Sequence, residues 1–282
     1  YLCNGRFADV ERNYSEAYAL AQEHGDYGSA MHAEMVWAMV QCYQGQLDSG
    51  RARMGGVADW ARGVDFAWIG PVLVMDSAAR FLAGDWQGAR KVSDESMVNP
   101  IEGTMAGIEP GSHLLLLANT GDPEAGRHLD ALQPRVCVAG QENQLGSWFA
   151  GMASLQAAAV LGLRERCASF YDCAVQLEQA GSHVVWSLGL TGKHAAIAAA
   201  AGGQWDRAKR HFDDSMARAE AMGNRVETAE LLRWQAQAKL WRNGPGDSQR
   251  ATELAEAARE AYTAIGMSRH VGMVEALLNA GG

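Results

Sequence analysis

The stretch Gly203-Gln204-Trp205-Asp206-Arg207-Ala208 decides the fold, because Gly84-Asp85-Trp86-Gln87-Gly88-Ala89 repeats its pattern. In both, an aromatic residue follows the glycine by two positions and an alanine follows it by five. Glycines extend this pattern along the chain at intervals of 40, 39, 37, 41, 41 and 43 residues: Gly5, Gly45, Gly84, Gly121, Gly162, Gly203 and Gly246. Such a fixed spacing is the signature of a repeat protein. The sequence therefore predicts repeats of roughly 40 residues.

A second series of glycines divides most of these repeats into two halves: Gly25, Gly63, Gly181, Gly223 and Gly266. Each glycine ends one apolar stretch, and alanine-rich runs such as residues 195–201 favour helix over strand. A single helix pair of this size cannot bury its apolar faces alone, so neighbouring pairs must stack. We expect an all-α fold, an α-α superhelix of about seven two-helix repeats, formed by residues 1–282 as one domain.

The spacing predicts the first helix of each repeat near 29–44, 66–83, 104–120, 143–161, 183–201 and 226–242, with a capping helix near 268–279. The second helix of each repeat fills the intervals. Prolines punctuate residues 99–134, at Pro100, Pro110, Pro123 and Pro134. Because proline removes a helix hydrogen bond, we expect an irregular middle there.

Composition narrows the possible functions. The formal net charge of −9 argues against direct contact with nucleic acid, which requires clustered Lys and Arg. The five cysteines form no CxxC pair, which suits reduced thiols and a cytoplasmic protein. We expect no membrane span, because the best candidate, residues 66–83, is interrupted by Pro71, Asp76 and Arg80.

Motifs for catalysis or cofactor binding are not evident. Residues 187–194 resemble a phosphate-binding loop only superficially, since Ser187 stands where that motif needs glycine and His194 where it needs Ser or Thr. The eight histidines are scattered rather than paired at metal-ligand spacing. We expect no catalytic residue, no metal site and no cofactor, although a site assembled from distant repeats would escape motif reading.

The turn pattern resembles the tetratricopeptide repeat, with Phe212 four residues beyond Ala208, but the period is longer than that family's 34 residues. Longer repeats of this kind, together with residues 244–254 and the final helix near 271–278, are similar to the superhelical region of the LuxR-type large ATP-binding regulators, the maltose regulator's subfamily, and of related bacterial signalling ATPases. The resemblance implies a regulatory domain next to an N-terminal nucleotide-binding engine. Because the chain begins inside a repeat, we expect it to be the C-terminal part of a larger protein.

Three functions remain open at the sequence level. The first is a non-enzymatic sensor and interaction domain of a bacterial signal-transduction or transcriptional regulator, which binds a small-molecule effector or a protein partner on its concave face. The second is a scaffold that binds a protein or peptide and senses nothing. The third is an enzyme with a dispersed site.

The candidate binding residues come from the tetratricopeptide register, in which the first helix of each repeat faces the concave groove. This register selects His32, Met35, Phe149, Met152, Gln156 and Lys193. Met35, Phe149 and Met152 would supply contact area, while Lys193 or His32 would meet an acidic group of the ligand. Methionine and tryptophan at helical spacing also suit the core, so the sequence leaves their place undecided.

Overall fold

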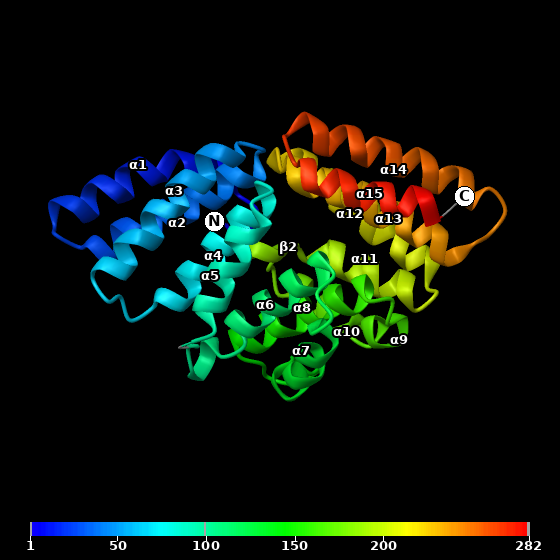
Figure 1. Cartoon of the computed structure of the whole chain (residues 1–282), viewed down its shortest axis with the longest axis horizontal. Helices are drawn as coiled ribbons and strands as arrows, with labels where there is room; N and C mark the ends of the chain where they lie inside the picture. Colours follow the sequence, from blue (N-terminus) through cyan, green and yellow to red (C-terminus); the bar gives the residue numbers. More distant parts are fainter. Residues whose placement is uncertain (1, 99, 281–282) are drawn as a thin grey trace.

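Helices form most of the computed structural model, which describes residues 2–98 and 100–280 (Figure 1). One helix of each pair belongs to a row that we call the inner helices: α2 (Tyr27–Tyr43), α4 (Ile69–Leu82), α6 (Ile108–Thr120), α8 (Leu145–Val160), α11 (Thr191–Ala201), α13 (Arg225–Arg242) and α15 (Ser268–Ala280). The outer helices are α1 (Phe7–Glu23), α3 (Leu47–Gly63), α5 (Trp86–Ser96), α7 (Ala125–Leu132), α9 (Arg164–Ala168), α10 (Tyr171–Gln179), α12 (Trp205–Met222) and α14 (Asp247–Ala264). Consecutive helices pack on one another along the chain. The prediction of an all-α superhelix is confirmed.

The seven glycines that set the period share one backbone conformation. Their φ angles lie between 71° and 86°, in the left-handed region that favours glycine over residues with a Cβ atom. The second series departs from this pattern once. Gly63 remains within α3, and Asp65, with φ of 50°, makes the left-handed turn instead. The sequence period is thus a periodicity of the left-handed turns that precede the outer helices.

The middle of the array is irregular. A short 3₁₀ turn, η1 (Gly103–Met105), precedes α6, and α7 has only 8 residues before a second turn, η2 (Gln133–Arg135), which contains Pro134. A connection that contains a turn at residues 138–141 then leads to α8. In the next repeat α9 and α10 together take the place of one outer helix, separated near Phe170.

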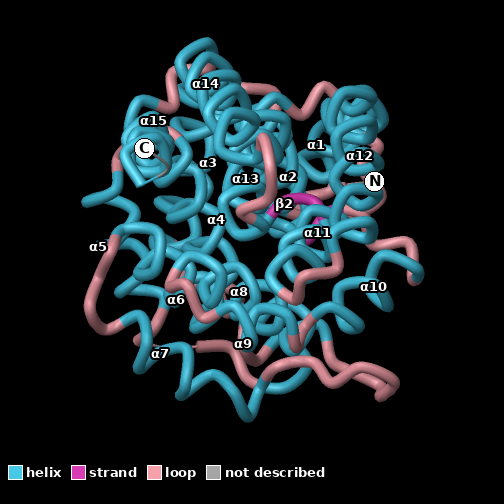
Figure 2. Tube along the Cα trace, turned by 90° about the vertical axis from the view of Figure 1, so that its right-hand side faces the viewer, coloured by secondary structure: helices cyan, strands magenta, loops and turns pink. Residues whose placement is uncertain are grey.

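The segment 183–190 is a β-hairpin, so the prediction of a helix over 183–201 is wrong for its first eight residues. Strand β1 (Val184–Val185) pairs with β2 (Gly189–Leu190) in antiparallel register around a 3₁₀ turn, η3 (Trp186–Leu188). The two adjacent β-branched residues, Val184 and Val185, favour a strand over a helix. Gly189, with φ of 88°, favours the turn. Figure 2 shows the hairpin among the helices, close to α11.

This hairpin joins the first repeat to the fifth. The carbonyl of Cys3 accepts hydrogen bonds from the backbone N–H groups of His183 at 2.8 Å and Val184 at 2.9 Å. Tyr43, at the end of α2, donates its hydroxyl proton to the carbonyl of Trp186. The curvature therefore brings the first repeat against a segment that is distant in sequence, beyond the contacts between neighbouring repeats.

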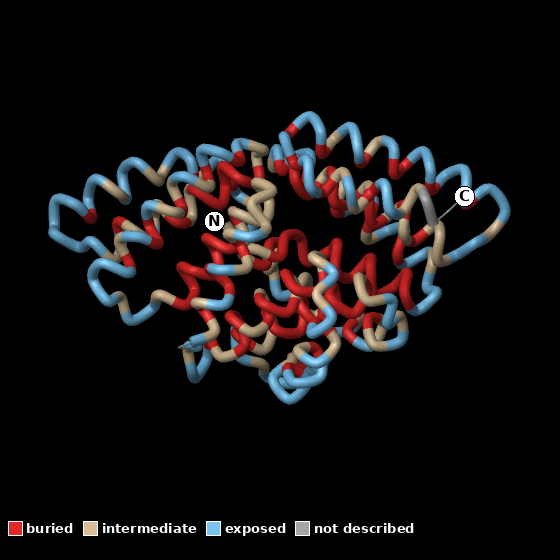
Figure 3. The backbone as a smooth tube through the Cα atoms, viewed as in Figure 1, coloured by how far each residue is buried: buried red, intermediate tan, exposed pale blue. Residues whose placement is uncertain are grey.

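A second closure lies between α4 and α15. The rings of Phe81 and His270 stand edge to face with centroids 4.8 Å apart, and Trp86 also packs edge to face on His270. The buried positions gather on the inner helices, whereas α1 and α14 expose most of their residues (Figure 3). Every residue of α11 is buried, because its alanines let neighbouring helices approach closely. The core thus surrounds the centre of curvature.

Candidate functional site

A pocket of about 80 Å³ lies where the inner helices converge, and we call it the central pocket. Each of the seven inner helices contributes at least one residue to its wall, and η3 contributes two. Its polar lining residues are Tyr43, Ser77, Ser112, Asn119, Gln156, Ser187, Lys193, Glu227, Glu230 and His270. The apolar ones are Ala78, Phe81, Leu82, Leu115, Leu116, Leu188 and Val226. Residues up to 227 positions apart in sequence thereby line one pocket.

One wall carries a buried ion pair. Nζ of Lys193 lies 2.7 Å from Oε1 of Glu227, and the two side chains are only 2% and 3% exposed. Lys193 also donates to the carbonyl of Leu188 at 3.1 Å, and the N–H of Leu190 donates to Oε2 of Glu227 at 3.0 Å. Burial raises the pKa of Glu227, although the charge of Lys193 opposes this rise. Each charge therefore has a protein partner.

A second buried charge pair lies one turn further along α13. Nη2 of Arg233 is 2.7 Å from Oε2 of Glu230, and Tyr262 on α14 donates its hydroxyl proton to the other carboxylate oxygen. The Arg233 guanidinium also stacks over the Trp234 ring, 4.5 Å from its centroid. Burial disfavours the carboxylate, but Arg233 and Lys193 together hold the pKa of Glu230 well below its usual range. Glu230 therefore remains ionised and compensated.

Three neutral side chains of the pocket have polar atoms without a protein partner. These atoms are Oε1 of Gln156, Oγ of Ser187 and both ring nitrogens of His270. Gln156 is 6% exposed and His270 is 1% exposed, so bulk water does not satisfy them freely. Burial lowers the pKa of His270 to about 4, which keeps its ring neutral at pH 7. Buried polar atoms normally have partners, so these groups call for a ligand or ordered water.

The structure divides the sequence-predicted site residues among three places. Gln156 and Lys193 line the central pocket. Phe149 and Met152 lie in the core, 2% and 0% exposed, and offer no groove surface. Phe149 packs against Gly111 of α6, where an added Cβ would come 3.2 Å from its ring. The tetratricopeptide register misplaces them because α8 is buried along nearly its whole length.

His32 and Met35 line a different space, which we call the N-terminal cavity, of about 500 Å³. Its wall consists of Leu2, Cys3, Val10, Asn13, Tyr14, Ala17, Ser29, His32, Ala33, Met35, Val36, Met39, Met75 and Trp186. This lining is mainly apolar and rich in methionine.

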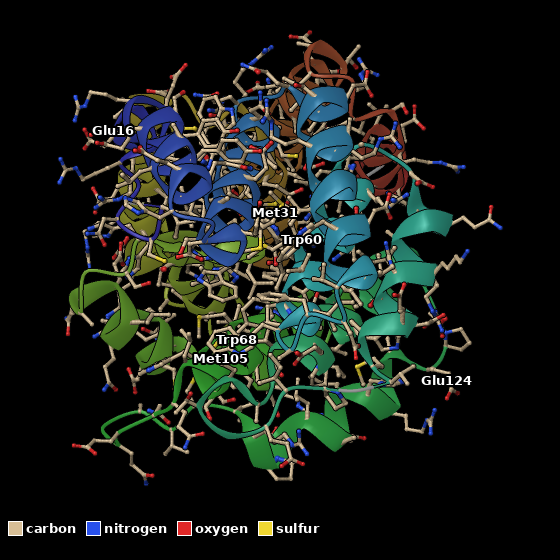
Figure 4. All side chains as sticks on the ribbon, turned by 90° about the vertical axis from the view of Figure 1, so that its left-hand side faces the viewer. Glu16, Met31, Trp60, Trp68, Met105 and Glu124 are labelled. Carbon is tan, nitrogen blue, oxygen red and sulfur yellow. The ribbon has the colours of Figure 1, made fainter. Side chains whose placement is uncertain are left out.

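The tryptophans and methionines outside this cavity differ in exposure. Trp68 is 58% exposed and Met105 only 9%, and both lie on the side of the molecule in view in Figure 4.

The sequence did not point to Tyr43, Ser187, Glu227, Glu230 or His270. One signal existed, because Glu227, Glu230 and Arg233 recur at three-residue spacing and therefore lie along one side of α13. No sequence pattern pointed to Ser187 of the hairpin or His270 of α15, since they reach the pocket only through contacts between distant repeats.

Two arrangements resemble parts of catalytic triads. Nδ1 of His113 lies 3.0 Å from Oγ of Ser93 and 3.8 Å from Asp94, so one nitrogen faces both groups, whereas a relay uses opposite ring nitrogens. His211 lies between Tyr171, at 3.2 Å, and Glu178, at 3.6 Å. None of these six residues lines the central pocket or the N-terminal cavity. Neither arrangement therefore has an adjoining substrate space in these two cavities.

Metal-ligating side chains are not grouped: within residues 2–98 and 100–280, no three His, Cys, Asp or Glu side chains gather to hold an ion. Among the described helices, none combines the length and apolar character needed to cross a bilayer. No protein-family model matches the chain, and no curated protein shows significant sequence similarity to it. The central pocket and the repeat pattern are therefore the features of the chain that bear on its function.

Proposed function

We propose that the chain is a non-enzymatic sensor and interaction domain of a bacterial signal-transduction or transcriptional regulator that acts in the cytoplasm, with its small-molecule effector bound in the central pocket. The observation that carries this proposal is the pocket wall, to which all seven inner helices contribute. A ligand there would contact repeats from both ends of the array at once.

This geometry suits signalling. A ligand shifts a conformational equilibrium only by as much as it binds one state better than another. Because His270 of α15 lines the pocket and packs on Phe81 of α4, this part of the wall depends on the contact between α4 and α15. An effector that contacts both α4 and α15 would favour the conformation in which these helices touch. A partner protein would then bind the outer surface of that conformation.

The LuxR-type part of the proposal rests on the repeat period and on residues 244–254, which resemble the superhelical region of those regulators. In such a protein the partner would be an N-terminal NTPase domain of the same chain. A conserved nucleotide-binding motif upstream would support this assignment, and its absence from the complete gene product would count against it.

Ligand retention tests the effector proposal. The purified chain is incubated with the low-molecular-mass fraction of a bacterial extract, washed, denatured, and its released compounds are identified by mass spectrometry. We expect one compound that is retained by the wild type, that raises its melting temperature, and that Gln156→Leu no longer retains. Ser154→Ala is the matched control, because Ser154 is a buried residue of the same helix outside the pocket wall. Equal retention by Gln156→Leu, or no retention by the wild type, would contradict the proposal.

A protein-binding scaffold is the second candidate, and the N-terminal cavity favours it. Its methionine-rich lining and volume of about 500 Å³ suit an apolar side chain or helix face, which such surfaces accommodate by repacking. Under this alternative, Met35→Lys would abolish partner binding while Gln156→Leu would leave it unchanged.

A further inference from the structure

We propose that the ligand of the central pocket is an uncharged small molecule that carries both hydrogen-bond donors and hydrogen-bond acceptors. This inference rests on the proposed function and names the chemical class of its effector. It follows from a comparison of the polar groups that the protein already satisfies with those that it leaves free.

The charged groups of the pocket are satisfied internally. Lys193 faces Glu227, and Glu230 faces Arg233, so two cations and two anions compensate one another. A ligand carboxylate that bound Lys193 would compete with Glu227 and leave that buried carboxylate without its partner. A ligand ammonium that bound Glu227 would strand Lys193 in the same way. Removal of one partner from a buried pair is strongly unfavourable, so the pocket selects against both signs of charge.

The groups left free are neutral. Oε1 of Gln156 can only accept a hydrogen bond, and the hydroxyl of Ser187 can donate or accept. The neutral ring of His270 offers one donor and one acceptor. A ligand that satisfies all three must itself donate and accept, as amides, alcohols and ureas do.

The remaining wall sets the size and shape of the ligand. Phe81, Leu115 and Leu116 line the pocket and favour an apolar portion beside the polar one. The volume of about 80 Å³ has room for only a few water-sized groups. A compact molecule, or the terminal group of a longer one, meets both requirements.

This conclusion replaces the hypothesis that Lys193 receives an acidic group of the ligand. That hypothesis treated Lys193 as a free cation on a groove, because sequence alone does not show that Glu227, 34 residues away, reaches the same point. With Glu227 in place, Lys193 contributes to the shape and rigidity of the wall.

Three molecules of nearly equal shape test the inference: propionamide, which is neutral, propionate, which is anionic, and propylammonium, which is cationic. Their binding to the intact chain is measured by saturation-transfer NMR titration at pH 7.5. We expect propionamide to bind in the millimolar range and at least tenfold more tightly than either ion. Gln156→Leu and Ser187→Ala should each weaken this binding at least fivefold, whereas Ser154→Ala should leave it unchanged. Circular dichroism establishes that each variant is folded. If one of the two pocket variants misfolds, the other still tests the inference.

Each outcome decides the inference. Binding of propionate or propylammonium as tight as that of propionamide would overturn it, and so would the failure of all three to bind. The proposed function fails separately. A charged metabolite retained by the wild type and lost from Gln156→Leu would preserve the sensor function while refuting the uncharged class, whereas an absence of any retained metabolite would refute the function itself.

Discussion

Nζ of Lys193 and Oε1 of Glu227 lie 2.7 Å apart across the junction of α11 and α13, with both side chains almost fully buried. The carboxylate also caps the N–H of Leu190, the last residue of the hairpin. One ion pair therefore fixes α13, α11 and the hairpin relative to one another. The geometry of the central pocket depends on this connection.

Replacement of Lys193 by methionine should be strongly destabilising. The substitution keeps the volume of the side chain but leaves Glu227 buried without its cation, which costs about 3 to 5 kcal/mol of the free energy of unfolding. Urea denaturation followed by circular dichroism measures this loss.

Two controls separate the buried pair from a general effect of lysine removal. Adding Glu227→Gln to Lys193→Met removes the stranded charge and should recover part of the loss. Lys209→Met removes an exposed lysine whose ion pair with Asp213 lies on the surface, and it should change stability by less than about 1 kcal/mol. Equal effects of Lys193→Met and Lys209→Met would show that the buried pair is misassigned.

Gly189→Ala should disturb the same pair from the hairpin side. Gly189 has φ of 88°, and an added Cβ would fall 2.0 Å from Oε1 of Glu227 and 2.8 Å from Nζ of Lys193. We expect a loss of more than about 2 kcal/mol from the sum of backbone strain and displaced charges. Gly181→Ala is the matched control, since its φ is 84° but no atom lies within 4 Å of the added Cβ. Similar melting temperatures for the two variants would mean that steric contact with the ion pair is unimportant.

Phe149→Ala should destabilise the fold rather than only weaken binding. The ring is 2% exposed and packs α8 on α6, so its removal opens a cavity that costs about 3 to 5 kcal/mol. Trp68→Ala, at a position that is 58% exposed, should change stability by about 0.5 kcal/mol or less. Thermal unfolding of the two variants compares these effects, and an intact melting temperature for Phe149→Ala would place the ring outside the core.

Stability should fall as the pH is lowered from about 6.5 to about 4. Burial lowers the pKa of His113 and His270 to about 4 and that of His194 to about 3, against about 6.5 in the unfolded chain. The unfolded chain therefore binds protons in this window that the folded chain does not, and acid favours unfolding. For His270 alone the loss by pH 4 is about 3 kcal/mol. The raised pKa of Glu227, caused by burial, acts in the opposite direction and offsets part of it.

The measurement is the urea midpoint at a series of pH values between 7.5 and 4.5. His270→Gln should flatten the dependence between pH 6.5 and 5, because it removes one titrating group that faces Glu230 and Arg233. A slope that is the same in wild type and His270→Gln would refute the assignment.

The cysteines should differ sharply in reactivity. Burial raises the pKa of Cys42 and of Cys167 to about 12, and neither side chain is exposed. Cys3 is partly exposed, so iodoacetamide at pH 8 should label it first, and Cys42 and Cys167 only after denaturation. Peptide mass spectrometry over time follows the labelling, and rapid modification of Cys42 in the folded chain would contradict its burial.

The sequence predicted the helical array well because the period is a local signal: each glycine of the first series makes a left-handed turn shortly before an outer helix. The tetratricopeptide-like spacing of Ala208 and Phe212 is a local signal too, and both residues are buried on α12. The hairpin at residues 183–190 could not be predicted from local signals, because it is stabilised by the carbonyl of Cys3, about 180 residues away along the chain.

The candidate site was only partly predictable for the same reason. Gln156 and Lys193 were identified because they lie on inner helices at the expected register. Phe149 and Met152 share that register but face neighbouring helices, a difference that depends on how tightly α6 and α8 pack. His270 enters the pocket only because α15 returns to α4, and no periodic pattern records that return.

The bonds from Cys3 to His183 and Val184, and from Tyr43 to Trp186, change how the array should come apart. An open stack of repeats can fray from either end, one unit at a time, with a graded melting profile. Here the first repeat is hydrogen-bonded to the fifth. Its unfolding therefore breaks the contacts with the hairpin as well as those with the second repeat. Amide exchange in α1 and α2 should accordingly be as slow as exchange in α11. The first and fifth repeats would then open in one cooperative step, and the array would not fray from its N-terminal end.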